Sequence, residues 1–217
     1  MNRTDHEDTI KRILHHRVSA IVRTDDQQLA RDAMQAAVDG GFRVVEFTLT
    51  TPGALELVSE FAAKPDLLVG AGTVLSTHAA RDAVNAGARF IVSPVTDAIV
   101  IAEATLLNAV SFPGASTPTE METAHRAGAD FVKVFPAPNG GVDFIRAIRG
   151  PLPHLRLFPT AGVDADNVAD YLRAGCAGCG FVRSLFVPED MIARNFTAIR
   201  QRAEQIIKRV TEWRSKK

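Results

Sequence analysis

Four successive apolar runs in the middle of the chain end at a proline, in the pairs Ser93-Pro94, Phe112-Pro113, Phe135-Pro136 and Phe158-Pro159. Neighbouring prolines in this series are 19, 23 and 23 residues apart. A proline just past a strand end stops the hydrogen-bonded ladder without breaking the strand before it. The spacing therefore predicts a repeated unit of one strand and one helix.

The same alternation extends along the whole chain. Eight apolar runs rich in Val, Ile and Phe have the length of strands, at about 17–22, 42–49, 67–71, 88–92, 108–112, 130–135, 155–158 and 179–184. Helical patterns lie between them at 27–38, 52–63, 77–85, 97–107, 118–126, 142–149 and 165–174, and a long helix follows from about 189. Residues 5–16 predict one more helix, with Ile10, Ile13 and Leu14 on one face.

Eight strand–helix units predict a (β/α)8 TIM barrel, with the extra N-terminal helix across its bottom. No linker rich in Pro, Gly or Ser marks a second domain, so residues 1–217 are expected to form one domain. The rival fold is a doubly wound open sheet. Such a sheet normally has a glycine-rich fingerprint after its first strand, but Ile21-Val-Arg-Thr-Asp-Asp contains no glycine.

Charge and hydropathy exclude several classes of partner. The chain has 25 basic and 25 acidic residues, and a net charge of zero does not favour nucleic-acid binding. No apolar run approaches the roughly 18 residues that a membrane span needs. Residues 1–16 are charged where a signal peptide is apolar. We therefore expect a cytoplasmic protein that binds neither nucleic acid nor membrane.

The two cysteines are Cys176 and Cys179, spaced C-x-x-C. A zinc site needs further ligands at suitable spacing, and the sequence supplies neither a second cysteine pair nor a His-x₃₋₅-His motif. No metal is expected. A redox dithiol is one interpretation, but these cysteines lead into an apolar strand rather than open a helix, which favours a role as small packing residues.

Two charged residues interrupt apolar strands. In Phe42-Arg-Val-Val-Glu46-Phe-Thr48, alternation places Glu46 with Val44 and Thr48 on one face. In Asp130-Phe-Val-Lys133-Val-Phe-Pro136 it places Lys133 with Phe131 and Phe135. Both faces of a barrel strand are covered, so both charged side chains are expected in the barrel interior and must be paired or functional.

An ion pair between Glu46 and Lys133 would contribute little to stability, because desolvation of two charges consumes most of their attraction. The chemical interpretation is stronger. Burial lowers the pKa of a lysine, and a neutral amine attacks a ketone to form a Schiff base. A neighbouring carboxylate such as Glu46 moves the protons that this chemistry requires. No cofactor is needed for these steps.

Small and glycine-rich segments recur at predicted strand ends, in Gly70-Ala-Gly-Thr73, Pro113-Gly-Ala-Ser-Thr117 and Pro159-Thr-Ala-Gly162. Backbone N–H groups in such turns, close to helix N-termini, bind anions. Each segment alone is weak evidence, since a glycine also serves simply to make a turn.

Six motifs together, in order and spacing, resemble the 2-keto-3-deoxy-6-phosphogluconate (KDPG) / 4-hydroxy-2-oxoglutarate (KHG) aldolases. They are Val45-Glu46-Phe-Thr-Leu, Gly70-Ala-Gly-Thr-Val-Leu75, Ser93-Pro94, Pro113-Gly-Ala-Ser-Thr117, Lys133-Val-Phe-Pro-Ala137 and Pro159-Thr-Ala-Gly162. The resemblance runs from about Ile10 to Pro188. It implies a class I, metal-free aldolase that cleaves a 2-keto-3-deoxy acid to pyruvate and an aldehyde, and it implies a homotrimer.

The resemblance also implies roles for individual residues. Lys133 is the Schiff-base lysine and Glu46 the proton-transfer residue. Thr73 lies near the pyruvate carboxylate, and Arg23 is an active-site arginine that ends the first strand. The remaining substrate-binding positions are Pro94, Thr160, Ala161, Gly162, Arg183 and Ser184.

Three departures from the family pattern concern substrate binding. Leu49-Thr50-Thr51 stands where many members have an arginine for the pyruvate carboxylate, which leaves more of that task to Arg23 or Thr73. The phosphate loop Pro-Thr-Gly-Gly is Pro-Thr-Ala161-Gly162 here, and Gly-Gly-Ser at the eighth strand is Val182-Arg183-Ser184. A methyl group at Ala161 obstructs the backbone, whereas Arg183 offers a charged contact instead. In the alternative orientation, Arg183 points outward to a surface acid.

Two other functions compete with the aldolase. A sugar-phosphate epimerase or related synthase would use the same barrel and anion loops, but it gives a lysine inside a strand no specific task. A ligand-binding barrel without catalysis would account for the three departures. Trapping with pyruvate and borohydride separates these alternatives, because only a Schiff-base enzyme is irreversibly alkylated.

Overall fold

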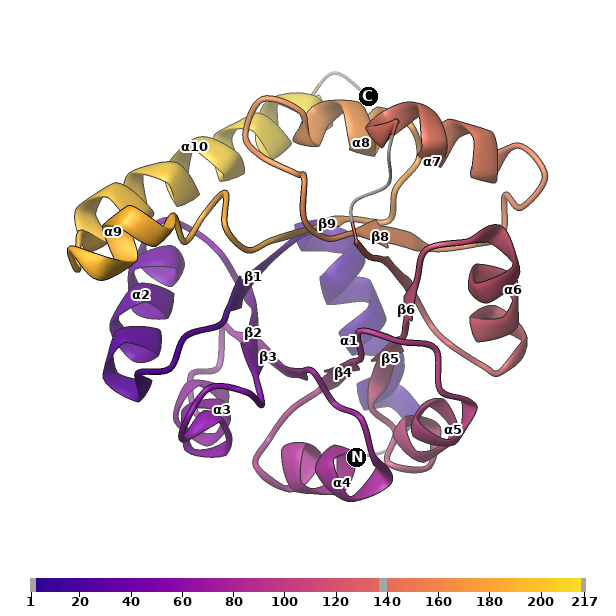
Figure 1. Cartoon of the computed structure of the whole chain (residues 1–217), viewed down its shortest axis with the longest axis horizontal. Helices are drawn as coiled ribbons and strands as arrows, with labels where there is room; N and C mark the ends of the chain where they lie inside the picture. The colour runs from indigo at the N-terminus through magenta and orange to yellow at the C-terminus, as the bar shows by residue number, and fades with distance from the viewer. Residues whose placement is uncertain (1–2, 137–139, 216–217) are drawn as a thin grey trace.

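The computed structural model describes residues 3–136 and 140–215. Ala137, the last residue of one of the six motifs, lies outside the described residues. Helices alternate with parallel strands along the chain, so the α/β class predicted from the sequence is confirmed. Figure 1 shows the strands at the centre of the molecule and the helices α2 to α10 around them.

The strands of the described chain form two parallel sheets. The larger sheet has the order β5-β4-β3-β2-β1-β9, and the smaller has the order β6-β7-β8. The larger sheet consists of β1 (Val18–Val22), β2 (Val44–Thr48), β3 (Leu68–Gly72), β4 (Phe90–Val92), β5 (Val110–Phe112) and β9 (Cys179–Phe181). The smaller sheet consists of β6 (Gly114–Ala115), β7 (Val132–Val134) and β8 (Leu157–Pro159).

Backbone contacts connect the two sheets at both margins. Pro113 alone separates β5 from β6, and its carbonyl accepts a hydrogen bond from the Lys133 N–H at 2.9 Å. The predicted strand at 108–112 therefore continues past its proline, because Pro113 enters the ladder with β7 through its carbonyl and needs no N–H. At the other margin Thr160 forms a parallel bridge with Gly180.

The helices that cover the strands begin at recognisable caps. Thr117 and Glu120 form a reciprocal capping box, with Pro118 in the first turn, which explains where α6 begins. The helices are α1 (Arg3–His16), α2 (Gln27–Asp39), α3 (Ala54–Ala62), α4 (Thr77–Asn85), α5 (Ala98–Leu106), α6 (Pro118–Arg126), α7 (Gly141–Arg149), α8 (Val168–Arg173), α9 (Pro188–Ile192) and α10 (Phe196–Ser215). No helix in residues 3–136 and 140–215 is both long enough and apolar enough to cross a membrane.

The predicted C-terminal helix is interrupted. We expected one helix from about Glu189, but α9 ends at Ile192 and α10 begins at Phe196. Between them Arg194 takes the left-handed conformation, with φ of 51°, which no helix continues through. The Arg194 guanidinium donates to Asp26 Oδ2 at 2.7 Å, so an ion pair holds the break against the start of α2.

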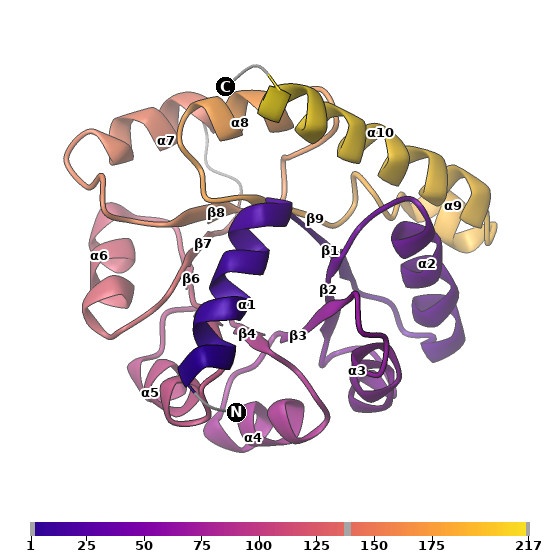
Figure 2. The same cartoon turned by 180° about the vertical axis from the view of Figure 1, so that it is seen from behind.

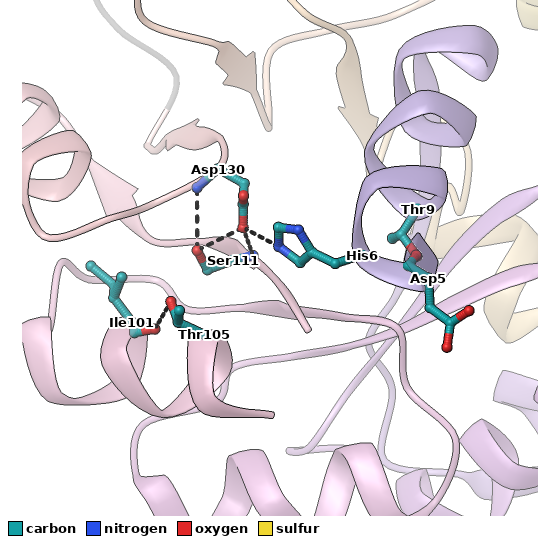
Figure 3. A network of polar contacts seen from close by, with 7 residues as sticks. All are labelled: Asp5, His6, Thr9, Ile101, Thr105, Ser111 and Asp130. Carbon is teal, nitrogen blue, oxygen red and sulfur yellow. Dashed lines mark hydrogen bonds and ion pairs between the residues drawn. The ribbon is translucent and has the colours of Figure 1, made fainter. Parts of the chain in front are cut away.

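The N-terminal helix covers one end of the strands, as predicted (Figure 2). Ile13 is buried there, and Ile10 and Leu14 pack beside it. A polar network anchors the first turns of this helix, as Figure 3 shows. His6 Nε2 lies 3.2 Å from Asp130 Oδ2, which also accepts from the Ser111 backbone N–H at 2.9 Å.

Strand alternation separates an outer core from an inner one. Val45 and Phe47 belong to the large cluster between the strands and the helices, whereas Val44 faces inward. The inner cluster contains a phenylalanine layer, by which we mean Phe90, Phe112, Phe131 and Phe158. The rings of Phe112 and Phe131 are stacked with centroids 4.5 Å apart.

Cys176 and Cys179 are free and buried in the outer core. Burial raises the pKa of the Cys176 thiol to about 12 and also raises that of Cys179. Neither thiol ionises near neutral pH, so both behave as small apolar residues and not as a reactive pair.

Candidate active site

Glu46 lies in the middle of β2 and faces the interior, as its register predicts. It is only 2 % exposed. Its Oε1 atom has no hydrogen-bond partner in the described part of the protein. Burial raises the pKa of the Glu46 carboxyl, although the positive charges of Lys133 and Arg23 act in the opposite direction. A buried carboxyl with a free oxygen and a raised pKa is suited to taking up and releasing a proton.

Lys133 lies at the centre of β7 and faces the same interior. It is 6 % exposed, and its Nζ lies 5.0 Å from the centroid of the Phe135 ring. Burial lowers the pKa of the Lys133 ammonium, Glu46 opposes this effect, and Arg23 adds to it. These surroundings favour the neutral amine that attacks a carbonyl.

Glu46 and Lys133 interact electrostatically without forming a closed ion pair. No ion pair within 4.0 Å joins Lys133 to any carboxylate of the described chain. A structural pair would bring the charged atoms into contact, because only close contact with further hydrogen bonds offsets their desolvation. The arrangement therefore differs from a structural ion pair, and both groups remain free for a reacting molecule.

Two cavities meet at Lys133. Below it, a cavity of about 10 Å³ is lined by polar residues, Glu46, Ser19 and Thr160, and by rings of the phenylalanine layer, Phe90, Phe112 and Phe158. It has the size of about one water molecule. Above it, a cavity of about 560 Å³ has the size of a small-molecule site. Lys133 lines both, so its amine stands at the floor of the larger cavity.

Most of the predicted substrate-binding residues gather around the larger cavity. With Lys133, its lining includes Arg23, Thr160, Ala161, Gly162, Arg183 and Ser184. Thr73 is not part of this lining, but its Oγ1 accepts a hydrogen bond from Arg23 Nη2 at 3.2 Å. Pro94 is half-buried and lines neither of the two cavities described above.

The three departures from the family pattern have distinct surroundings. The hydroxyls of Thr48 and Thr50 lie 3.1 Å apart, so Thr50 joins a threonine cluster instead of reaching into the cavity. Ala161 and Gly162 take consecutive left-handed conformations, with φ of 73° and 68°, which is strained for the alanine.

Arg183 lies in a turn instead of at a strand end, because β9 ends at Phe181 and not at the predicted residue 184. Its side chain is exposed and forms no ion pair or hydrogen bond with another described residue. The neighbouring Ser184 hydroxyl donates to the Val163 carbonyl at 2.5 Å, which joins this turn to the loop that follows Thr160.

Two of the glycine-rich segments lie partly within strands. Gly70 and Gly72 belong to the C-terminal part of β3, and Gly114 and Ala115 form β6, so these glycines are paired strand residues and not turn residues. The second segment continues to Thr117, which caps the start of α6. The interior positions Ser19 and Gly72 were missed as site residues. Alternation along Val18-Ser19-Ala20-Ile21 would have indicated Ser19, which shares its face with Ile21.

In the part of the chain that the structure describes, no three His, Cys, Asp or Glu side chains come together as metal ligands.

Comparison with known proteins identifies the family. The model of the aldolase family described as KDPG and KHG aldolase matches residues 9–202. The chain belongs to this family. It is a class I aldolase, a carbon–carbon lyase that works through a Schiff base.

Individual relatives agree over most of their length. The chain is 37% identical over 160 residues to the KHG/KDPG aldolase of Escherichia coli K12, which covers 73% of this chain and 75% of that one. It is 34% identical over 198 residues to the 2-dehydro-3-deoxy-phosphogluconate aldolase of Treponema pallidum, covering 88% and 93%. Among solved structures, the KDPG aldolase of Legionella pneumophila, with pyruvate captured as a covalent carbinolamine, superimposes with a TM-score of 0.81 at 27% identity, covering 91% and 97%.

Proposed function

We propose that this aldolase cleaves a 2-keto-3-deoxy acid reversibly to pyruvate and an aldehyde, through an imine on Lys133. The observation that carries the proposal is the placement of Lys133: a buried amine without a salt-bridge partner in the described chain, at the floor of a cavity of about 560 Å³ and beside the carboxyl of Glu46. The names of the relatives support the substrate class. The pyruvate carbinolamine of the Legionella enzyme supports the intermediate.

In the proposed reaction the neutral Lys133 amine adds to the C2 carbonyl, and the carbinolamine loses water to give a protonated imine. Glu46 then takes the proton of the C4 hydroxyl. The C3–C4 bond breaks, its electron pair moves into the imine to form an enamine, and the aldehyde leaves. Glu46 returns the proton to C3, and water hydrolyses the resulting imine to pyruvate and the free amine.

Substrate binding is divided between two ends of the cavity. We assign Arg23 to the pyruvate half, where its hydrogen bond to Thr73 Oγ1 holds the guanidinium near the reacting pair. Thr73 contributes through this bond from outside the lining, and Pro94, which lines neither cavity, is assigned no contact. We assign Thr160, Ala161, Gly162, Arg183 and Ser184 to the far end of the substrate. Arg183 there supplies a positive charge for a terminal phosphate or carboxylate.

The fold that supports this site is proposed to be a closed (β/α)8 barrel in one domain, residues 1–217. Backbone bonds from β7 to the β5–β6 segment, and the bridge between Thr160 and Gly180, support closure of the ring. The homotrimer rests on the family resemblance alone. The cytoplasmic location stays a prediction.

Borohydride trapping tests the proposal. Reduction in the presence of pyruvate should add one pyruvate-derived group to Lys133, located by peptide mass spectrometry. Lys64 is the matched control, because its Nζ is engaged with Gln35 Oε1 and with the Phe61 ring, and none of these residues lines the cavity. Lys64→Arg should leave trapping unchanged and Lys133→Arg should abolish it. Labelling at another lysine, or none at saturating pyruvate, would contradict the proposal.

A further inference from the structure

Gly72, the last residue of β3, leaves the space that the Glu46 carboxyl occupies. A β-carbon at position 72 would lie 1.9 Å from Glu46 Oε1 and 2.8 Å from Cδ. Non-bonded atoms do not approach so closely, so no side chain fits here unless the carboxyl moves. Gly72 is not among the glycines with a positive φ, so its backbone conformation does not require a glycine. Its lack of a side chain matters because it leaves room for the Glu46 carboxyl.

The Glu46 carboxyl is held by shape instead of by hydrogen bonds. Buried polar groups are normally fixed in place by hydrogen-bonding partners. Glu46 Oε1 has none, and no described residue donates a hydrogen bond to this side chain. The atoms packed around the carboxyl must then determine where it points.

The strand register shows in which direction the carboxyl leans. Glu46 is paired with Gly70, yet its oxygen contacts the position two residues further along β3. The side chain therefore leans toward the carboxyl end of the strands, where the larger cavity opens. Just beyond, Thr73 takes a left-handed conformation with φ of 59° and accepts the hydrogen bond from Arg23, so the backbone next to Gly72 is constrained.

We infer that Gly72 is a positioning residue for Glu46, whose carboxyl reaches the reacting carbon only because position 72 has no side chain. The inference rests on the proposed function, since it concerns the proton that Glu46 exchanges with C3. A larger residue at position 72 would displace the carboxyl and slow this proton transfer. It would leave the Lys133 amine, on a different strand, free to form the imine.

Gly72→Ala separates the two steps. Imine formation is measured by borohydride trapping with pyruvate, and proton transfer by the exchange of the pyruvate C3 hydrogens for deuterium, followed by NMR. We expect trapping within twofold of the wild type and exchange slower by roughly 10²-fold, the usual effect of misplacing a catalytic group by about 1 Å. Unchanged exchange would overturn the inference, as would an equal loss in both measurements.

Gly70→Ala is the matched control on the same strand. A β-carbon at Gly70 would meet the Phe90 ring first, at 2.2 Å, and not the Glu46 carboxyl. This variant should lower the melting temperature and reduce trapping and exchange by the same factor. A selective loss of exchange in Gly70→Ala would overturn the inference, because the effect would then not depend on contact with Glu46.

A double-mutant cycle with Glu46→Asp tests the contact directly. Aspartate is one methylene shorter, so the alanine methyl has more room beside it. The loss of exchange caused by Gly72→Ala should be at least tenfold smaller in the Glu46→Asp background, and equal losses in both backgrounds would overturn the inference. Should Gly72→Ala not fold, the double variant should fold, and failure of both would also overturn it. Absence of trapping in the wild type would contradict the proposed function instead.

Discussion

The space enclosed by the strands holds two layers of inward-facing side chains. The same strand alternation places both layers, but they differ in the contacts that their side chains make. The lower one is the phenylalanine layer, in which the Phe112 ring lies 4.5 Å from Phe131 and 5.2 Å from Phe158. The upper one, here called the polar layer, consists of Ser19, Glu46, Lys133 and Thr160. At β7 the two layers are only two residues apart along the chain, at Phe131, which precedes the strand, and at Lys133 within it.

The side chains of the phenylalanine layer pack against one another, whereas polar atoms of the polar layer lack hydrogen-bond partners in the described chain. Each phenylalanine ring contacts another ring, and such packing is a main source of stability. In the polar layer, Ser19 Oγ and Glu46 Oε1 have no described partner. Burial opposes the charged forms of both Glu46 and Lys133. Buried polar groups without hydrogen-bond partners are typical of a functional site, and well-packed neighbouring residues offset their cost in stability.

Glu46→Gln is expected to have the largest effect, and it should separate catalysis from stability. The amide cannot accept the proton, so kcat should fall by roughly 10²- to 10⁴-fold while pyruvate trapping on Lys133 persists. Steady-state kinetics and borohydride trapping on the same preparation measure both. Unchanged turnover would make Glu46 a structural residue.

The same variant should be more stable than the wild type at neutral pH. The folded state raises the pKa of Glu46, so this residue favours folding below its ordinary pKa of about 4.5, and that contribution is lost as the pH rises through the folded pKa. Burial disfavours the charged carboxylate, so Glu46 opposes folding at pH values where the unfolded carboxyl is ionised, and glutamine avoids this cost. Thermal melting should show an increase in Tm at pH 7 that shrinks toward pH 4. A lower Tm at pH 7 would show that the charge stabilises the layer.

Phe112→Ala should produce the opposite result in the lower layer. Removing a ring that contacts Phe90, Phe131 and Phe158 leaves a cavity, and the usual cost of such a change is about 3–5 kcal/mol in the free energy of unfolding. Below its melting temperature the variant should still trap pyruvate on Lys133. Urea denaturation gives the loss. A stability loss below about 1 kcal/mol would mean that the layer relaxes around the gap.

Of the residues in these layers, alternation with a period of two predicted the inward-facing Glu46, Phe131 and Lys133, but Ser19 was missed. Glu46 and Lys133 stand out as charges inside apolar strands, and their inward orientation is confirmed. The partners of each residue depend on neighbouring strands, which periodicity does not specify. Gly72 was interpreted as part of a turn. Its contact with Glu46 depends on the pairing of β2 with β3, which the sequence of β3 alone does not reveal. Pro113 looked like a strand end because its carbonyl, not its missing N–H, enters the ladder.

Strand and helix ends were less accurately predicted than strand centres. β9 ends at Phe181, three residues before the predicted boundary, because the chain turns where the Leu185 N–H bonds to the Val182 carbonyl. The α9–α10 break was missed because its cause is the left-handed conformation of Arg194, a residue type with no preference for it.

Arg183→Ala is expected to have the smallest effect. It tests whether a side chain at the mouth of the cavity is also left without a protein partner so that it can bind substrate, like the polar atoms of the polar layer. Arg183 is exposed in the cavity lining, and no acid of the described chain pairs with it, so the outward orientation toward a surface acid finds no support. Its guanidinium is therefore free for an anionic group at the far end of the substrate. The loss of one charged hydrogen bond, about 1.5–3 kcal/mol, should raise KM for substrates with a terminal phosphate or carboxylate by roughly 10- to 100-fold.

Trapping with pyruvate should be unaffected, because pyruvate does not reach this end. Arg146→Ala is the control, since Arg146 pairs with Asp143 on the outer face of α7 and its loss should leave KM unchanged. An unchanged KM for Arg183→Ala on every anionic substrate would show that the far end of the substrate is neutral or is held by the backbone N–H groups of the neighbouring loops alone.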